Sequence, residues 1–450
     1  GPVDSGWCSP GASDDEGQQL EADAAAAATQ RPTPLPPAPL SPGLRALFGA
    51  AGEEAPVEEV RVPRNVSLRV VTISDIHVDN PQNRKWFEKH LPKRTRTLFN
   101  VLVLPGDVSD DLERLRETLQ MFARSFDLVC YTPGNHDLWV ARKNSPPDSM
   151  AKLREVLRVC QECKVRTRPV RLRSGGPAPT PDVLLVPLLS FYSSDWDREP
   201  ELPWTPEQQR AMEAWTDFRA IRWPQEVTDE VRRRDGEVLF GKDGTSPAFS
   251  ELFAAASEPW LEGLLPERRG EEAGALAPVV ISYSHYLPRQ ELFPEKRFLV
   301  DASLHKVAGS PALEAQIRRL RPHVHVFGHT HLTVDLVLEG QRYLQWALGT
   351  PGEQRAMTRA VGDTGMLVLY DAGGGEPHLA PVQETFWGRF FAKSPRTPTE
   401  TCPAAFVRGL FARMYPDVKL PFDDEHFLRT PNPGPPIASY EGLYEPRWRL

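Results

Sequence analysis

Three consecutive side chains, those of Asn135, His136 and Asp137, could bind a metal ion or move a proton. The apolar run before them predicts a buried strand, and Pro133-Gly134 would end that strand abruptly. Because glycine lets the backbone turn sharply, the three side chains would project from the end of the strand. Taken alone, the segment is also compatible with an ordinary polar turn, so its meaning depends on similar strand ends elsewhere in the chain.

Five strand ends in all supply side chains of the types that bind metals. They are Asp75 with His77, Asp107, Asn135 with His136, His285, and His329 with His331. In open α/β sheets, sites form beyond the carboxyl ends of the strands, which is where all five groups fall. Gathering eight polar side chains around an apolar void would be costly, and two divalent ions would offset that cost.

The types of donor narrow the choice of metal. Carboxylate, amide and imidazole groups without any cysteine suit Mn, Fe or Zn. A carboxylate offers several lone pairs, so Asp107 is the natural bridge between two ions. The residues therefore predict a centre of two divalent or trivalent metal ions.

The elements that would position these side chains alternate between strands and helices. Apolar residues at helical spacing predict helices beginning near residues 112, 150 and 310. Two further strands flank the turn at residues 339–340. The other predicted strands cover residues 68–73, 100–104, 128–131, 183–186, 277–282, 324–327 and 366–369. This alternation predicts an α/β domain.

This set of motifs, in this order, resembles the calcineurin-like metallophosphoesterase superfamily. The motifs that carry the resemblance are Asp75-x-His77, Gly106-Asp107, Gly134-Asn135-His136-Asp137, His285, and Gly328-His329-x-His331. The resemblance implies an α/β fold in which a two-sheet β-sandwich is flanked by helices.

The resemblance also implies a role for each residue. One ion would be held by Asp75, His77, Asp107 and His331, and a second by Asp107, Asn135, His285 and His329. His136 would be the catalytic imidazole that binds neither ion. Asp110 matches the position of an aspartate that orients this histidine in the Ser/Thr phosphatase branch. Its alternative role is that of an acidic residue favoured at a helix N-terminus.

The implied chemistry is hydrolysis of a phosphate ester. Two ions roughly 3.5–4 Å apart bind a bridging water, lower its pKa and clamp the phosphoryl oxygens for in-line attack by the resulting hydroxide. His136 would protonate the leaving oxygen or stabilise its charge. We expect a small phosphomonoester as substrate, because a covering insertion suits a small substrate better than a polymer. The alternatives are a phosphodiesterase acting on a cyclic or nucleotide substrate, and a metal-stabilised binding scaffold.

Departures from the Ser/Thr phosphatase pattern place the chain in another branch of the superfamily. Asp111-Leu112 stands where that branch has Arg-Gly, and Asp137 stands where it has Glu. That branch also lacks a histidine at the position of His331. The runs 80–86, 136–140 and 288–292 are similar to those of predicted plant and algal members of the superfamily.

Three residues outside the motifs are candidates for substrate contact. Arg289 follows His285 closely and could bind an anion, although a solvated surface position is an alternative. Tyr192 and Trp139 follow strands that form the site and could stack on a substrate.

The chain divides into three parts by composition. Residues 1–62 form an acidic arm rich in Pro and Ala, which we predict to be disordered because few large apolar side chains offset the entropy of ordering. Residues 63–379 form the metallophosphoesterase domain. It contains an insertion at about 191–276 with five tryptophans, which is either a lid or ordinary packing. Residues 380–450 are expected to pack along the domain as a C-terminal extension.

Charge and cysteine content indicate which binding partners and which cellular compartment to expect for the protein. The chain has 450 residues, a net charge of −8 and a pI of about 5.9, so we expect no binding to nucleic acid or to a membrane. Five scattered cysteines favour an intracellular compartment, cytoplasmic or organellar. The start at Gly1-Pro2 resembles the remnant of a cleaved tag or a processed end, so a targeting segment is expected to be missing. Expected partners are a phosphorylated small-molecule substrate and a domain that binds the Pro-rich run 32–39.

Overall fold

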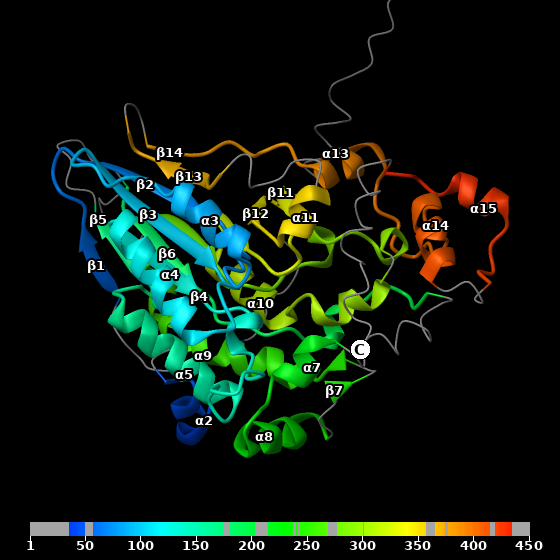
Figure 1. Cartoon of the computed structure of the whole chain (residues 1–450), viewed down its shortest axis with the longest axis horizontal. Coiled ribbons are helices and arrows are strands. Elements are labelled where there is room, and N and C mark those ends of the chain that lie inside the picture. Colours follow the sequence, from blue (N-terminus) through cyan, green and yellow to red (C-terminus); the bar gives the residue numbers. More distant parts are fainter. Residues whose placement is uncertain are drawn as a thin grey trace, which may run out of the picture.

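Two β-sheets packed face to face form the centre of the protein, with helices on the outside (Figure 1). The structure is a computed structural model, and the statements below concern the residues that it describes. These are residues 36–49, 57–173, 181–202, 215–236, 240–241, 244–268, 277–299, 301–356, 365–373, 377–414 and 419–433.

The first sheet has five strands in the order β14-β13-β2-β3-β4 within the described residues. Their bounds are His378–Leu379 (β14), Leu367–Asp371 (β13), Ser67–Thr72 (β2), Leu98–Pro105 (β3) and Leu128–Thr132 (β4). The three strands β2, β3 and β4 are parallel, so their carboxyl ends lie at one edge of the sheet.

The second sheet has seven strands in the order β1-β5-β6-β9-β10-β12-β11 over the same described ranges. Their bounds are Glu58–Arg61 (β1), Val170–Arg173 (β5), Val183–Pro187 (β6), Val279–Tyr283 (β9), Val324–Phe327 (β10), Gln341–Trp346 (β12) and Thr333–Leu338 (β11). Strands β6, β9, β10 and β12 are parallel. A separate short hairpin joins β7 (Phe240–Gly241) to β8 (Gly244–Thr245).

One hydrophobic cluster joins the two sheets. Val103 and Tyr131 of the first sheet and Ile281 and Val326 of the second are all fully buried in it. Burial on this scale stabilises each such side chain by about 1.5–3 kcal/mol relative to an exposed position. The sandwich of two sheets flanked by helices confirms the predicted fold class.

The helices have the bounds that follow. They are α2 (Pro42–Leu47), α3 (Pro81–His90), α4 (Leu112–Ser125), α5 (Ser149–Glu162), α7 (Thr216–Ala220), α8 (Gln225–Asp235), α9 (Pro247–Arg268), α10 (Pro311–Leu320), α11 (Pro351–Ala356), α13 (Phe386–Lys393), α14 (Ala405–Met414) and α15 (Asp424–Arg429). Short 3-10 segments are η2 (His136–Leu138), η3 (Ser194–Trp196), η4 (Gln290–Leu292), η5 (Lys296–Phe298) and η6 (Ala302–Val307). No helix among the described residues has the length and apolar character needed to cross a membrane.

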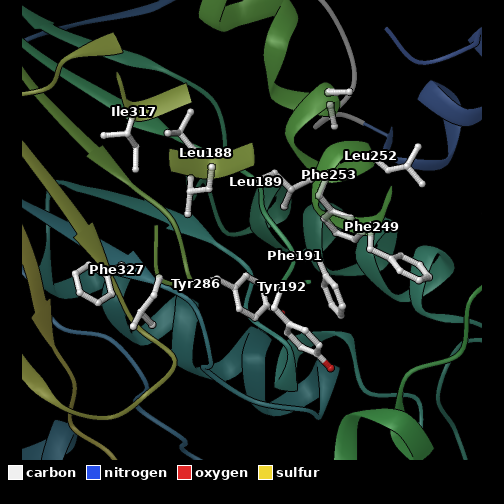
Figure 2. Packing of buried hydrophobic residues seen from close by; sticks show 14 of the residues in the cluster. Leu188, Leu189, Phe191, Tyr192, Phe249, Leu252, Phe253, Tyr286, Ile317 and Phe327 are labelled. Carbon is white, nitrogen blue, oxygen red and sulfur yellow. The ribbon is translucent and has the colours of Figure 1, made fainter. Parts of the chain in front are cut away.

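The Trp-rich insertion packs into a second hydrophobic cluster. Phe249 and Phe253 of α9 lie against Phe191, which follows β6 (Figure 2). Trp223 packs on the same ring at a centroid distance of 5.1 Å. Of the other insertion tryptophans, Trp204 lies outside the described residues. The described aromatic side chains of the insertion therefore belong to this cluster or pack against it.

The predicted disorder of residues 1–62 is wrong for two segments of the arm. Leu40, Leu44 and Phe48 are buried in the second cluster, and Ser41 caps α2 by accepting from the Leu44 amide at 3.3 Å. Strand β1 pairs in parallel with β5. Three apolar side chains at four-residue spacing anchor this helix within a Pro-rich context that favoured disorder. Residues 1–35 and 50–56, which include part of the run 32–39, lie outside the described residues.

The C-terminal extension contacts the domain through aromatic side chains. Phe298 of η5 is packed against Trp387 and Phe390 of α13, at centroid distances of 6.1 and 5.2 Å. Arg396 also reaches into the domain, where its Nη1 donates to the Phe293 carbonyl at 2.8 Å. Residues 434–450 lie outside the described residues.

The buried carboxylate of Asp137 ties the ends of β3 and β4 together. Its Oδ2 accepts from the amides of Asp107 at 2.8 Å and Gly134 at 2.9 Å. Its Oδ1 accepts from the amides of Val108 and Ser109 at 3.0 and 3.1 Å. Four backbone donors that follow two strands are thus satisfied by one side chain.

We expect Asp137→Asn to lower the free energy of unfolding by about 2–4 kcal/mol, because the amide group would face two buried N–H donors. Equilibrium unfolding in urea measures the change. A value within about 0.5 kcal/mol of the wild type would show that these four hydrogen bonds do not hold the loops.

Candidate metal centre

Five loops meet at one edge of the sandwich, each leaving the carboxyl end of a parallel strand. They follow β2 (Asp75 and His77), β3 (Asp107), β4 (Asn135 and His136), β9 (His285) and β10 (His329 and His331). The parallel pairing of β2 with β3 and β4, and of β9 with β10, brings these ends together. The structure thus gathers all eight of the side chains that the sequence analysis placed at strand ends.

Five of the eight residues have left-handed backbone conformations. Their φ angles are 50° at Asp75, 39° at His77, 55° at Asp107, 80° at His329 and 56° at His331. Asp and His tolerate this region better than most side chains, yet each such residue costs of order 1–3 kcal/mol. The surrounding contacts must therefore hold these loops against strain.

Two glycines are required by close approach of the loops. A Cβ atom at Gly134 would lie 2.2 Å from Asp107 Oδ1 and 2.6 Å from His285 Cε1. Gly106 has a φ of 79°, and a Cβ atom there would lie 2.5 Å from His285 Nδ1. The sequence interpretation of Gly134 as a sharp turn is incomplete, because its φ is not positive and its role is to leave room for the site.

The first group of donor atoms comes from Asp75, His77, Asp107 and His331. One oxygen or nitrogen from each lies within 4.8 Å of the others. His77 Nε2 is 2.9 Å from His331 Nε2 and 3.9 Å from Asp107 Oδ2. His331 Nε2 is 3.6 Å from Asp75 Oδ1. These separations suit four ligands directed at one ion.

The second group comes from Asn135, His285 and His329, again with Asp107. Asn135 Oδ1 lies 3.0 Å from His285 Nε2 and 3.1 Å from His329 Nδ1. The two imidazole nitrogens are 3.3 Å apart, and His285 Nε2 is 3.5 Å from Asp107 Oδ2. Asp107 Oδ2 therefore faces both groups, as expected of a bridging carboxylate.

Backbone carbonyls determine which nitrogen of His285 and of His329 carries a lone pair that faces the centre. His285 Nδ1 is 2.9 Å from the Pro105 carbonyl, and His329 Nε2 is 2.8 Å from the Val307 carbonyl. A carbonyl only accepts, so these nitrogens carry the hydrogens and the opposite nitrogens present lone pairs. Asn135 Oδ1 is also an acceptor. Three acceptors thus face one another at 3.0–3.3 Å with no hydrogen between them, an arrangement that repels unless a cation lies among the three.

Burial favours the uncharged form of both the imidazoles and the carboxyl groups, and only the neutral imidazoles are already in the state that metal binding needs. Burial lowers the pKa of His77 and of His329 to about 3, so both imidazoles are neutral at pH 7. It also lowers the pKa of His285 well below its ordinary value. Burial raises the pKa of Asp75 to about 6 and that of Asp107 well above its usual range, because the interior disfavours their charge. A divalent cation would stabilise both carboxylates, so the donor set fits a metal centre.

Glu353 of α11 is a site residue that the sequence interpretation missed. Its Oε2 lies 2.7 Å from His331 Nδ1 and directs His331 Nε2 towards the first group. Burial disfavours the imidazolium, yet the Glu353 carboxylate prevails and raises the pKa of His331 to about 9. The Glu353 pKa falls to about 2 because the charge of His331 outweighs burial. No pattern around Glu353 marks this contact, which joins positions 22 residues apart.

His136 lies at the edge of the centre. Its side chain is 29% exposed, against 5% for His77, and its Nε2 is 3.8 Å from Asp107 Oδ2. The Trp139 ring stacks on the imidazole at a centroid distance of 3.7 Å. This imidazole is therefore more exposed than that of His77, although both lie at a similar distance from Asp107 Oδ2.

The structure does not support Asp110 as the residue that orients His136. Asp110 Oδ1 accepts from Arg142 Nε at 3.0 Å, and the same guanidinium contacts Asp79. Within the described residues, the stacking partner of His136 is Trp139 instead. The spacing that suggested Asp110 comes from a branch whose loop differs here at Asp111-Leu112.

The three candidates for substrate contact have different surroundings. Arg289 is buried against the carboxylates of Glu291, Glu314 and Glu339, so its charge is already neutralised and anion binding is not supported. Tyr192 is fully buried, with its ring stacked on His329 at 6.2 Å. Of the three, Trp139 reaches the partly exposed edge of the centre.

Comparison with known proteins gives a family match and a curated relative. A family model described as calcineurin-like phosphoesterase matches residues 68–332. The chain is 30% identical over 126 residues to the acyl-carrier-protein phosphodiesterase PptH of Mycobacterium tuberculosis (strain ATCC 25618 / H37Rv). That alignment covers 27% of this chain and 36% of the relative, so the match spans about a third of the relative's length.

Solved structures give weaker matches. The crystal structure of phosphopantetheinyl hydrolase PptH from Mycobacterium tuberculosis aligns with a TM-score of 0.46 and 18% identity, covering 70% of this chain and 99% of that one. A putative 5′-nucleotidase from Staphylococcus aureus aligns with a TM-score of 0.28 and 12% identity, covering 62% of this chain and 48% of that one.

The ion pair of His331 with Glu353 predicts a pH dependence of stability for the metal-free protein. The pKa of His331 is raised from 6.5 to about 9, so the stabilisation is complete below pH 6.5 and is lost as the pH rises towards 9. The shift corresponds to a decline of about 3 kcal/mol in the free energy of unfolding.

Denaturation of the metal-free protein at several pH values measures this decline. Glu353→Gln removes the charge that raises the pKa, so its unfolding free energy should vary much less across the same range. An equal decline in both proteins would assign the effect to other groups.

Proposed function

The chain belongs to the calcineurin-like phosphoesterase family, and from this premise we propose that it hydrolyses a phosphodiester with two bound metal ions. The observation that carries the proposal is the pair of donor groups that share Asp107 Oδ2. Asp75, His77 and His331 would hold one ion with Asp107, whereas Asn135, His285 and His329 would hold the other. Mn, Fe and Zn suit these oxygen and nitrogen donors.

The chain's own residues divide the remaining work. When bound, two such ions lower the pKa of a shared water and neutralise charge on the phosphoryl oxygens. His136 is the partly exposed imidazole at the edge of the centre, where it would protonate the leaving oxygen or stabilise its charge. Trp139 stacks on that imidazole and limits its rotation.

The charge of the surroundings favours a diester over a monoester. In the described part of the chain, the charged partners of the eight side chains are carboxylates and imidazoles, with no lysine or arginine among them. A phosphomonoester is a dianion near neutral pH and would need more positive charge than a monoanionic diester. The relative from Mycobacterium tuberculosis, which its name describes as a phosphodiesterase, supports the same choice.

The small phosphomonoester expected from the sequence remains the competing substrate. That expectation depended on the insertion as a cover over the site. The described aromatic side chains of the insertion pack in or against the second hydrophobic cluster, and this packing gives the expected cover no added support.

We expect the Mn-loaded protein to hydrolyse bis-para-nitrophenyl phosphate with a kcat/KM at least about tenfold above that for para-nitrophenyl phosphate. Tenfold corresponds to about 1.4 kcal/mol in transition-state stabilisation. Initial rates of nitrophenol release measure both. The reverse preference would return the proposal to a phosphomonoesterase.

We expect His136→Ala to lower kcat by about 10²–10⁴-fold on the preferred substrate while two metal ions remain bound. Metal content and kcat are measured on the same preparation. The matched control is His90→Ala, which removes an exposed imidazole on α3. Equal turnover of the two variants would exclude His136 from the reaction, and a protein inert towards every ester would favour a metal-stabilised scaffold.

A further inference from the structure

Asp217 is a fully buried carboxylate that comes from the insertion rather than from the five loops of the centre. It lies in α7 and is 1% exposed. Two backbone hydrogen bonds fasten this short helix to the segment after β4. The Val140 amide donates to the Ala220 carbonyl at 2.7 Å, and the Ser149 amide donates to the Arg222 carbonyl at 2.7 Å. The position of Asp217 is therefore fixed by the fold.

Four side-chain donors converge on the Asp217 carboxylate. They are Asn135 Nδ2 (3.0 Å to Oδ1 and 3.2 Å to Oδ2), Trp139 Nε1 (2.6 Å to Oδ1), Tyr192 Oη (3.1 Å to Oδ2) and Trp215 Nε1 (3.2 Å to Oδ2). Ionised, a carboxylate has about four lone-pair sites and accepts only, so four donors satisfy it.

This contact decides how the Asn135 amide is oriented. Only the Nδ2 side of an amide can face a carboxylate acceptor, so Oδ1 must point the opposite way. The opposite way is towards His285 Nε2 and His329 Nδ1. Without Asp217, the amide could reverse and direct its N–H groups at those nitrogens, which would remove an oxygen ligand from the second group.

The same carboxylate also holds the ring beneath His136. The bond from Trp139 Nε1 is the shortest of the four, and the Trp139 ring stacks on the imidazole at 3.7 Å. Asp217 thus contacts Asn135, which belongs to the second group of ligands, and Trp139, which stacks on His136.

We propose that Asp217 is a positioning residue that orients the Asn135 oxygen for the second metal ion and the Trp139 ring for His136. The proposal rests on the proposed function, since it assumes that the two groups of donors each bind an ion. It assigns the insertion a direct part in building the centre.

The test counts Mn²⁺ ions bound per chain and measures both affinities by calorimetric titration of the metal-free protein. Asp217→Asn offers one acceptor oxygen and places an N–H₂ group among the donors, so the Asn135 amide is no longer held. We expect the second ion to bind about 10–100-fold more weakly, with the first ion little changed. At two Mn²⁺ ions per chain, electron paramagnetic resonance should show a coupled Mn pair in the wild type and mainly a single bound Mn in the variant.

Asp335→Asn is the matched control. Asp335 is an equally buried carboxylate. It accepts from Arg342 Nε at 2.8 Å and from the backbone amide of Gln383 at 2.7 Å. It is far from α7 in sequence and has different hydrogen-bond partners from those of Asp217. Its loss should lower the melting temperature and leave both Mn²⁺ affinities unchanged. This comparison separates loss of a buried carboxylate in general from loss of the one that holds Asn135.

A reciprocal exchange provides a second variant. Asn135→Asp combined with Asp217→Asn restores an amide donor facing a carboxylate and leaves an oxygen for the second ion. Recovery of the second ion in this variant supports the proposal even if Asp217→Asn alone fails to fold. A folded exchange variant that binds only one ion overturns the proposal.

The outcomes distinguish this inference from the proposed function. If the wild type binds two Mn²⁺ ions and Asp217→Asn binds both with unchanged affinity, the positioning role is wrong and the metal centre stands. If the wild type does not bind two ions, the proposed function fails, and the inference fails with it.

Discussion

Mutual repulsion among lone pairs is the constraint on which the rest of this structure depends. Asn135, His285 and His329 direct three acceptors at one another within about 3 Å, and two carboxylates in the same interior have raised pKa values. A flexible chain would relieve such contacts by rotating side chains outwards. The fold prevents this by occupying the other end of each group with a donor or acceptor of its own.

The hydrogen-bond partners that hold the ligand side chains and their loops come from several parts of the fold. Carbonyls at Pro105 and Val307 hold two of the imidazoles, and Glu353 holds a third. Asp137 fastens two of the loops through four backbone amides. Five of the site residues have left-handed backbone conformations, each of which costs about 1–3 kcal/mol. Hydrogen bonds within and between the loops therefore offset the local backbone strain.

The sequence predicts the donors of this centre well, because they follow strands and form short motifs in a recognisable order. The eight side chains that follow strands are in fact gathered at one edge of the sandwich. The partners that hold these donors were not predictable. Asp217 contacts Asn135 across 82 residues of chain, and no motif around Asp217 indicates this contact. Asp110 shows the opposite failure. Its spacing from Asp107 suggested a contact with His136, but in the structure its carboxylate accepts from Arg142. The helix α2 was missed since its three anchoring side chains follow directly after the Pro-rich run 32–39.

The order of the ligands along the chain has a consequence for how the protein is made. Each group of donors includes residues from the first third of the domain and one histidine of the last of the five loops, His329 or His331, and the second group adds His285. On a ribosome, the strands that carry Asp75, Asp107 and Asn135 emerge long before that loop, and domains form as their chain appears. Neither group is complete until the loop after β10 has left the exit tunnel. Metal binding would thus wait for this loop, and a chain that ends before it would offer three of the four ligands in each group.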